Sequence, residues 1–251
     1  MSTTVKVRTL RTPVGTVRAL EVEGPWTSAC TARFSADGCD GVQWRPPKTK
    51  DRLACDHLVE FRPELRWLRM VTPQRMDDGA IGQLDRLESL SALTRGRNPL
   101  DLSDLTGLRH VALDDRPELT GFAGRRLEGA HFAFNQRRLA ELEQASQLTQ
   151  VKLEGSGTRS VDLSARMPRL TQLMVLTSKV ESLDGLDAPN LVSLYLDGRR
   201  SDHVLDVGPL ADLPNLRSVS IRGPRAVRNS RPLEAREGLS FGTHSDVRIE
   251  S

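Results

Sequence analysis

Side chains suited to molecular recognition recur at nearly equal intervals in the later part of the chain. They are His131, Lys152, Met174 and Tyr195, with successive spacings of 21, 22 and 21 residues. Tyrosine and methionine are enriched in the buried centres of protein interfaces, because tyrosine offers a large contact area and methionine adapts to irregular surfaces. If the fold brings these residues side by side, we expect a partner-binding surface bordered by the neutral amides Gln150 and Gln172.

Basic residues form a second pattern, just after each segment that we expect to be a strand. Lys50 and Arg75 lie at such points, and the residues that best define this basic edge are Arg95, Arg97, Arg137, Arg138, Arg199 and Arg200. Clustered Arg and Lys attract phosphate backbones, so this edge predicts an alternative function in polyanion or nucleic-acid binding. Acidic residues such as Asp77 and Asp202 share these loops, so a solvated rim is the competing interpretation.

Motifs of the common catalytic and metal-binding classes are missing. The sequence has no G-x-S-x-G, no H-E-x-x-H and no P-loop, and its three cysteines, Cys30, Cys39 and Cys55, lack metal-ligand spacing. We therefore expect a protein without catalytic residues, metal or cofactor.

The chain also lacks the marks of export. Its first residues contain no apolar signal-peptide core, no stretch is long enough to cross a membrane, and the net charge of +3 is mild. These features predict a cytoplasmic monomer that binds a protein, with nucleic acid the less favoured partner and no membrane association.

The elements that would position these residues are repeated apolar triplets. Three nearly superposable examples are Leu170/Leu173/Val175, Leu191/Leu194/Leu196 and Leu216/Val219/Ile221. Alternate side chains of a strand point to opposite faces, so the last two members point inward and the residue between them points outward. The outward residues of four successive triplets are the recognition residues named first.

The same spacing extends over most of the chain. The first residue of each clear triplet is Leu65, Leu87, Leu108, Leu127, Leu148, Leu170, Leu191 or Leu216, and the intervals run from 19 to 25 residues. Two atypical triplets precede them, Val17/Leu20/Val22 and Cys39/Val42/Trp44. We expect a capping strand over residues 1–12, a last strand containing Val247 and Ile249, and an outward Trp67.

The L-x-x-L-x-L pattern resembles that of bacterial leucine-rich repeat proteins with short repeats of about 21–22 residues. The resemblance implies an α/β-type, β-rich solenoid: a horseshoe with a parallel concave sheet and short 3₁₀ or irregular convex segments. It predicts a single domain over 1–251, with cap and atypical turns at 1–60, regular repeats at 61–224 and a cap at 225–251. Proteins of this family usually act as recognition surfaces, which implies a non-catalytic protein–protein interaction module, such as a regulator or inhibitor, that binds its partner on the concave face.

Overall fold

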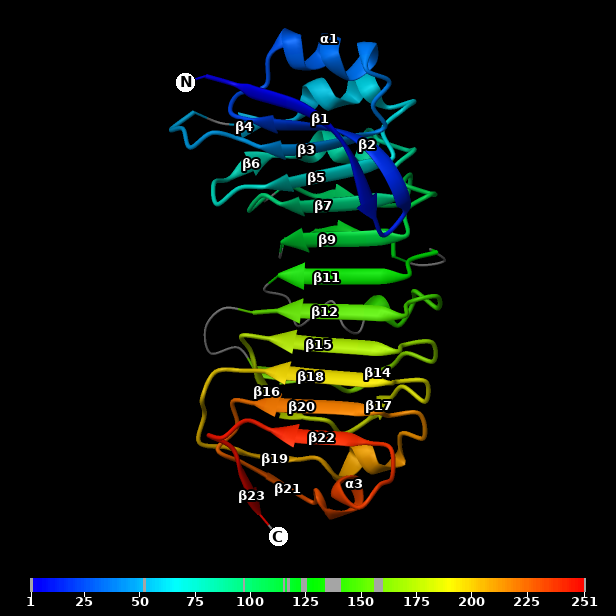
Figure 1. Ribbon diagram of the computed structural model, residues 1–251, viewed down its shortest axis with the longest axis vertical. Coiled ribbons are helices and arrows are strands. Elements are labelled where there is room, and N and C mark those ends of the chain that lie inside the picture. Colours follow the sequence, from blue (N-terminus) through cyan, green and yellow to red (C-terminus); the bar gives the residue numbers. More distant parts are fainter. Residues whose placement is uncertain are drawn as a thin grey trace. The chain divides into compact units, whose positions relative to one another are not determined.

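Figure 1 shows the computed structural model of the chain. It describes residues 2–51, 53–96, 98–114, 116, 118–122, 126–133, 141–155 and 160–250. The chain forms two compact units, residues 1–127 and 128–251, and each is described by itself. The single domain over 1–251 therefore stays a prediction.

The first unit is built on strands stacked in chain order (Figure 1). They are β1 (Thr4–Thr12), β2 (Gly15–Glu23), β3 (Gly41–Arg45), β5 (Trp67–Val71), β7 (Ser89–Leu93) and β9 (His110–Asp114). The strands β2 to β9 pair in parallel, and inward residues such as Leu68, Leu90 and Val111 are aligned and buried. The register predicted from the triplets is therefore confirmed, including the two atypical first turns.

The capping strand is also confirmed, and the turn that follows it packs against a face of the sheet. Strand β1 pairs antiparallel with β2, and Val14 in the turn between them packs in one cluster with Val17, Ala19 and Trp67. Trp67 was expected to point outward into solvent. It lies on the expected face but is only 7% exposed, because it belongs to this cluster with the hairpin turn.

The connections of the first unit are more regular than predicted. The segment after β2 forms a true α-helix, α1 (Ser28–Ala36), which buries Cys30 and Phe34. The later connections contain the 3₁₀ helices η1 (Asp56–Phe61) and η2 (Gly79–Gln83). Short parallel pairs, β4 (Leu53–Ala54) with β6 (Met76–Asp77) and β8 (Leu100–Asp101) with β10 (Leu119–Thr120), add strands where irregular chain was expected.

A buried ion pair links two connections of the first unit. Both guanidinium Nη atoms of Arg116 donate to the Asp78 carboxylate, at 3.0 and 2.8 Å, and both side chains are fully buried. The Thr94 hydroxyl donates to the same carboxylate at 2.6 Å. Buried charges are tolerated when they are paired and hydrogen-bonded, so this cluster fixes how the successive connections stack.

The second unit repeats the same plan. Its strands are β11 (Gly129–Ala133), β12 (Gln150–Glu154), β15 (Gln172–Leu176), β18 (Ser193–Asp197), β20 (Ser218–Arg222) and β22 (Ser240–Thr243). All pair in parallel, and Leu194 lies opposite Leu173 on one side and Val219 on the other. Stacked turns thus share one aliphatic core, which no single turn could bury alone.

Smaller sheets and short helices form the connections of the second unit. The sheets pair β13 (Ser160–Asp162) with β16 (Lys179–Ser182), β14 (Ala165–Arg166) with β17 (Leu186–Asp187), and β19 (Val204–Asp206) with β21 (Ala226–Arg228) and β23 (Arg248–Glu250). The helices are η3 (Gly208–Asp212) and α3 (Arg231–Glu234).

The predicted last strand is present, but it contains Ile249 without Val247 and belongs to a different sheet from the regular repeats. Ile249 lies in β23, which joins the small sheet, while the main sheet ends at β22. Val247 is buried but Ile249 is 51% exposed, so the two residues do not form an inward pair. The pattern was misleading because a short strand of either sheet gives the same alternation.

Candidate functional site

The recognition residues of the second unit lie in one row across its sheet. His131 in β11 is paired with Lys152 in β12, Lys152 with Met174 in β15, and Met174 with Tyr195 in β18. Neighbouring strands lie about 4.8 Å apart, so these side chains are direct neighbours on the face of the sheet opposite the core, which we call the open face. We call the row, with its two bordering glutamines, the recognition patch.

The end of the patch formed by Met174 and Tyr195 is apolar and accessible. Met174 is 37% exposed and Tyr195 is 36% exposed, and they lie on directly paired positions. Gln150 and Gln172 are paired with each other one row away and are exposed. The geometry therefore brings together all six residues that the sequence singled out for this surface.

Two acidic side chains complete this surface, and the sequence analysis missed both. The Glu154 carboxylate, at the end of β12, forms an ion pair with the Lys152 ammonium at 2.9 Å and lies 3.2 Å from His131 Nε2. Asp197, at the end of β18, accepts a long hydrogen bond of 3.4 Å from the Tyr195 hydroxyl. Each acid stands two residues after a patch residue, so strand alternation alone places it on the same face.

Protonation in the patch follows from burial and these contacts. Partial burial lowers the pKa of His131, and the neighbouring Lys152 charge acts in the same direction, against the contact with Glu154. The hydrogen bond from Lys152 lowers the pKa of Glu154. At neutral pH the patch therefore presents a neutral imidazole and a compensated Lys–Glu pair, so little net charge develops around Met174 and Tyr195.

The residues of the alternative basic edge fall in both units. Arg95 in the first and Arg199 and Arg200 in the second are exposed, and their side chains form no ion pair within the described part of the chain. Arg97, Arg137 and Arg138 lie outside the described residues. The edge therefore has accessible cations, but no continuous row of them can be traced from these positions.

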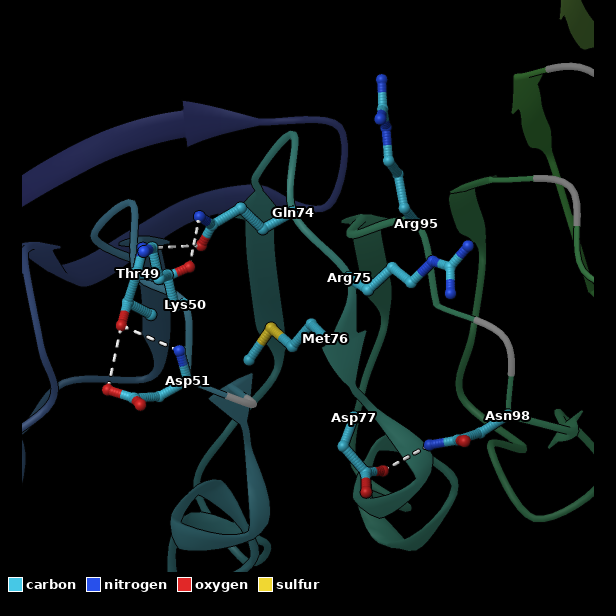
Figure 2. Close-up of a pocket in the computed structure, with 9 residues that line it drawn as sticks. All are labelled: Thr49, Lys50, Asp51, Gln74, Arg75, Met76, Asp77, Arg95 and Asn98. Atoms are coloured by element: carbon cyan, nitrogen blue, oxygen red, sulfur yellow. Dashed lines mark hydrogen bonds between the residues drawn. The ribbon is translucent and has the colours of Figure 1, made fainter.

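A cavity opens on the basic edge of the first unit, where the loops after β3, β5 and β7 meet (Figure 2). Its volume is ≈ 530 Å³, and it is lined by Thr49, Lys50, Asp51, Gln74, Arg75, Met76, Asp77, Arg95 and Asn98. In Figure 2 residues 49–51 form one side, Arg75 and Arg95 the opposite side, and Met76 lies between them. The sequence placed Lys50, Arg75 and Arg95 on this edge but gave no sign that their loops enclose a cavity.

The described residues give little support for metal or thiol chemistry. No group of three or more His, Cys, Asp or Glu side chains there is arranged to hold a metal ion. All three cysteines are free and buried. No helix in the described ranges is long and apolar enough to cross a membrane.

Comparisons with known proteins identify no family for this chain. No protein-family model matches the sequence, and no curated protein matches it. Among solved structures, internalin C2 from Listeria monocytogenes aligns with 84% of this chain and 71% of its own, at 16% sequence identity and a TM-score of 0.34. At that TM-score the likeness carries no argument about this chain, and the fold rests on the strand register alone.

Proposed function

We propose that this chain is a non-catalytic protein-interaction module that binds a partner protein on the open face of its sheet, through the recognition patch of the second unit. The proposal includes the expected concave shape of this face, a cytoplasmic and bacterial setting, a monomeric state and a role as a regulator or inhibitor of that partner. No cofactor takes part in it.

The observation that carries the proposal is the exposed Met174–Tyr195 pair. Large apolar side chains at adjacent positions in the middle of a sheet cost solvation free energy unless a partner covers them. Tyrosine combines a large contact area with a polar tip, and methionine adapts its shape. Gln172 beside Met174 and Gln150 beside Lys152 can form hydrogen bonds at a border without the desolvation cost of a charge, as polar groups do around an interface hot spot.

The electrostatics of the patch favour a protein over a polyanion. The Lys152 ammonium is paired with Glu154 at 2.9 Å, and the Asp197 carboxylate beside Tyr195 faces the Arg222 guanidinium at 3.8 Å. The charged groups of this face are therefore compensated by their neighbours and offer a phosphate backbone little net attraction. We therefore expect binding there to depend on packing and to respond only weakly to salt.

The second candidate function is polyanion or nucleic-acid binding through the basic edge. The observation that favours it is the exposure of Arg199 and Arg200 without an ion pair inside the described ranges. Such binding weakens steeply with salt, in proportion to the number of phosphate contacts. A salt titration therefore separates the two candidates.

The proposal is tested by capturing partners from a lysate of the native host with three matched baits. They are the wild-type protein, the patch variant Met174→Ala/Tyr195→Ala and the edge variant Arg199→Glu/Arg200→Glu. A partner retained by the wild type and the edge variant but lost by the folded patch variant supports the recognition patch. Retention by the patch variant with loss by the edge variant would instead favour the basic edge.

A further inference from the structure

The cavity of the first unit has the features of a ligand site, and it is separate from the recognition patch. Its volume of ≈ 530 Å³ lies within the range of about 300–1,000 Å³ typical of small-molecule sites. All of its lining residues belong to the loops and short strands between positions 49 and 98. The side chains of the lining indicate which class of ligand it would recognise.

The charged side chains of the lining favour an anionic ligand. Lys50, Arg75 and Arg95 are exposed, and none forms an ion pair within the described ranges. The two acids of the lining are already engaged by the walls: Asp51 accepts the Thr49 hydroxyl at 3.0 Å, and Asp77 accepts the Asn98 amide. The three exposed cations outnumber these two carboxylates, so the lining carries a net positive charge.

The walls of the cavity are tied to one another before any ligand arrives. The backbone N–H of Thr49 donates to the side-chain oxygen of Gln74 at 3.1 Å, and the Gln74 amide donates back to the Thr49 carbonyl at 2.7 Å. Asn98 ties the third loop to Asp77 in the same way. A site whose loops are already positioned loses less conformational entropy on binding.

Arg95 is held in an unusual conformation. Its φ is 48°, in the left-handed region that residues other than glycine rarely adopt. Its backbone N–H donates to the carboxylate of Asp114, and the preceding Thr94 is anchored to the buried Asp78. Strained backbone of this kind concentrates at functional sites, and here it fixes the root of the side chain beside Arg75.

The floor of the cavity adds an apolar contact. Met76 lies between the two walls in Figure 2 and is only 3% exposed. Guanidinium groups recognise phosphate and carboxylate oxygens through paired hydrogen bonds. We propose that this cavity, which we call the oxyanion pocket, binds a small molecule that carries phosphate or carboxylate groups, held by Arg75, Arg95 and Lys50, with its short apolar part over Met76.

The test titrates the full chain with pyrophosphate and, separately, with citrate at low ionic strength, using isothermal calorimetry. Pyrophosphate represents the phosphate class and citrate the carboxylate class, so the stronger ligand identifies the preferred chemistry. The test variant is Arg75→Gln/Arg95→Gln and the matched control is Arg199→Gln/Arg200→Gln. We expect saturable one-to-one binding that the test variant weakens about tenfold or more, while the control stays within about twofold.

Lys50→Gln provides an independent variant on the opposite wall, with an expected loss of about threefold or more. Its inclusion keeps the test valid if the double arginine variant unfolds, which its melting curve would reveal. Absence of heat from both ligands at about 10 mM overturns the proposal. So does equal affinity in the test variant and the wild type. An affinity that grows with polyphosphate chain length and falls equally in the control variant would also overturn it, in favour of a polyanion edge.

Discussion

Replacing Arg116 with Met tests the buried ion pair that orders the first unit. The substitution removes two charged hydrogen bonds, of 3.0 and 2.8 Å, from the Asp78 carboxylate and leaves that carboxylate buried without its counter-ion. Breaking a buried pair by removing one partner costs about 3–5 kcal/mol. In a unit of this size, that corresponds to a fall in melting temperature of roughly 10–20 °C.

The measurement is thermal and urea unfolding followed by circular dichroism. The matched control is Arg62→Met, which breaks an exposed pair with Asp85 of similar length, 2.7 Å; because solvent screens an exposed pair, its loss should change stability far less. The double variant Arg116→Met/Asp78→Asn removes the uncompensated charge, so it should recover part of the lost stability. If Arg116→Met costs no more than Arg62→Met, the buried pair does not hold the unit together.

The remaining predictions concern the register, a half-buried histidine and the cysteines. Leu194 is fully buried while Ser193 is partly exposed on the other face, so Leu194→Asp should unfold the second unit and Ser193→Asp should change its free energy of unfolding by less than about 1 kcal/mol; equal urea midpoints would show that the register is wrong. Partial burial against Trp26 and Trp44 lowers the pKa of His57 from its ordinary value of 6.5. The unfolded chain therefore takes up a proton first as the pH falls, and the free energy of unfolding decreases below about pH 7. His57→Phe should make this decrease shallower in urea titrations between about pH 7.5 and 5.5, and an unchanged pH dependence would contradict the assignment. Burial raises the pKa of the Cys39 and Cys55 thiols. These thiols should therefore react with a disulfide reagent far faster in urea than in buffer, and equal rates would show that the core opens readily in the native state.

The parts of the fold that depend on local pattern could be predicted from the sequence. The triplets fixed which residues point inward, because strand alternation and a constant repeat length leave no other register that buries Leu173 and Leu194 together. The same reasoning predicts that Met174 lies beside Tyr195, as the strand pairing confirms.

The parts that depend on contacts between distant segments could not be predicted. Trp67 is buried because a hairpin turn more than fifty residues earlier contributes Val14 to its cluster. Asp78 and Arg116 are 38 positions apart and lie in segments without a repeat motif. The oxyanion pocket likewise arises where three loops meet, and loop geometry carries no periodic signal.

The most direct test of the central claim is the affinity of the captured partner for the patch variant Met174→Ala/Tyr195→Ala, measured by calorimetry with the wild type as reference. Hot-spot residues contribute about 2 kcal/mol or more, so the variant should bind about 30-fold more weakly or worse while keeping its melting temperature. Wild-type affinity in the folded variant would contradict the claim that the recognition patch is the binding site.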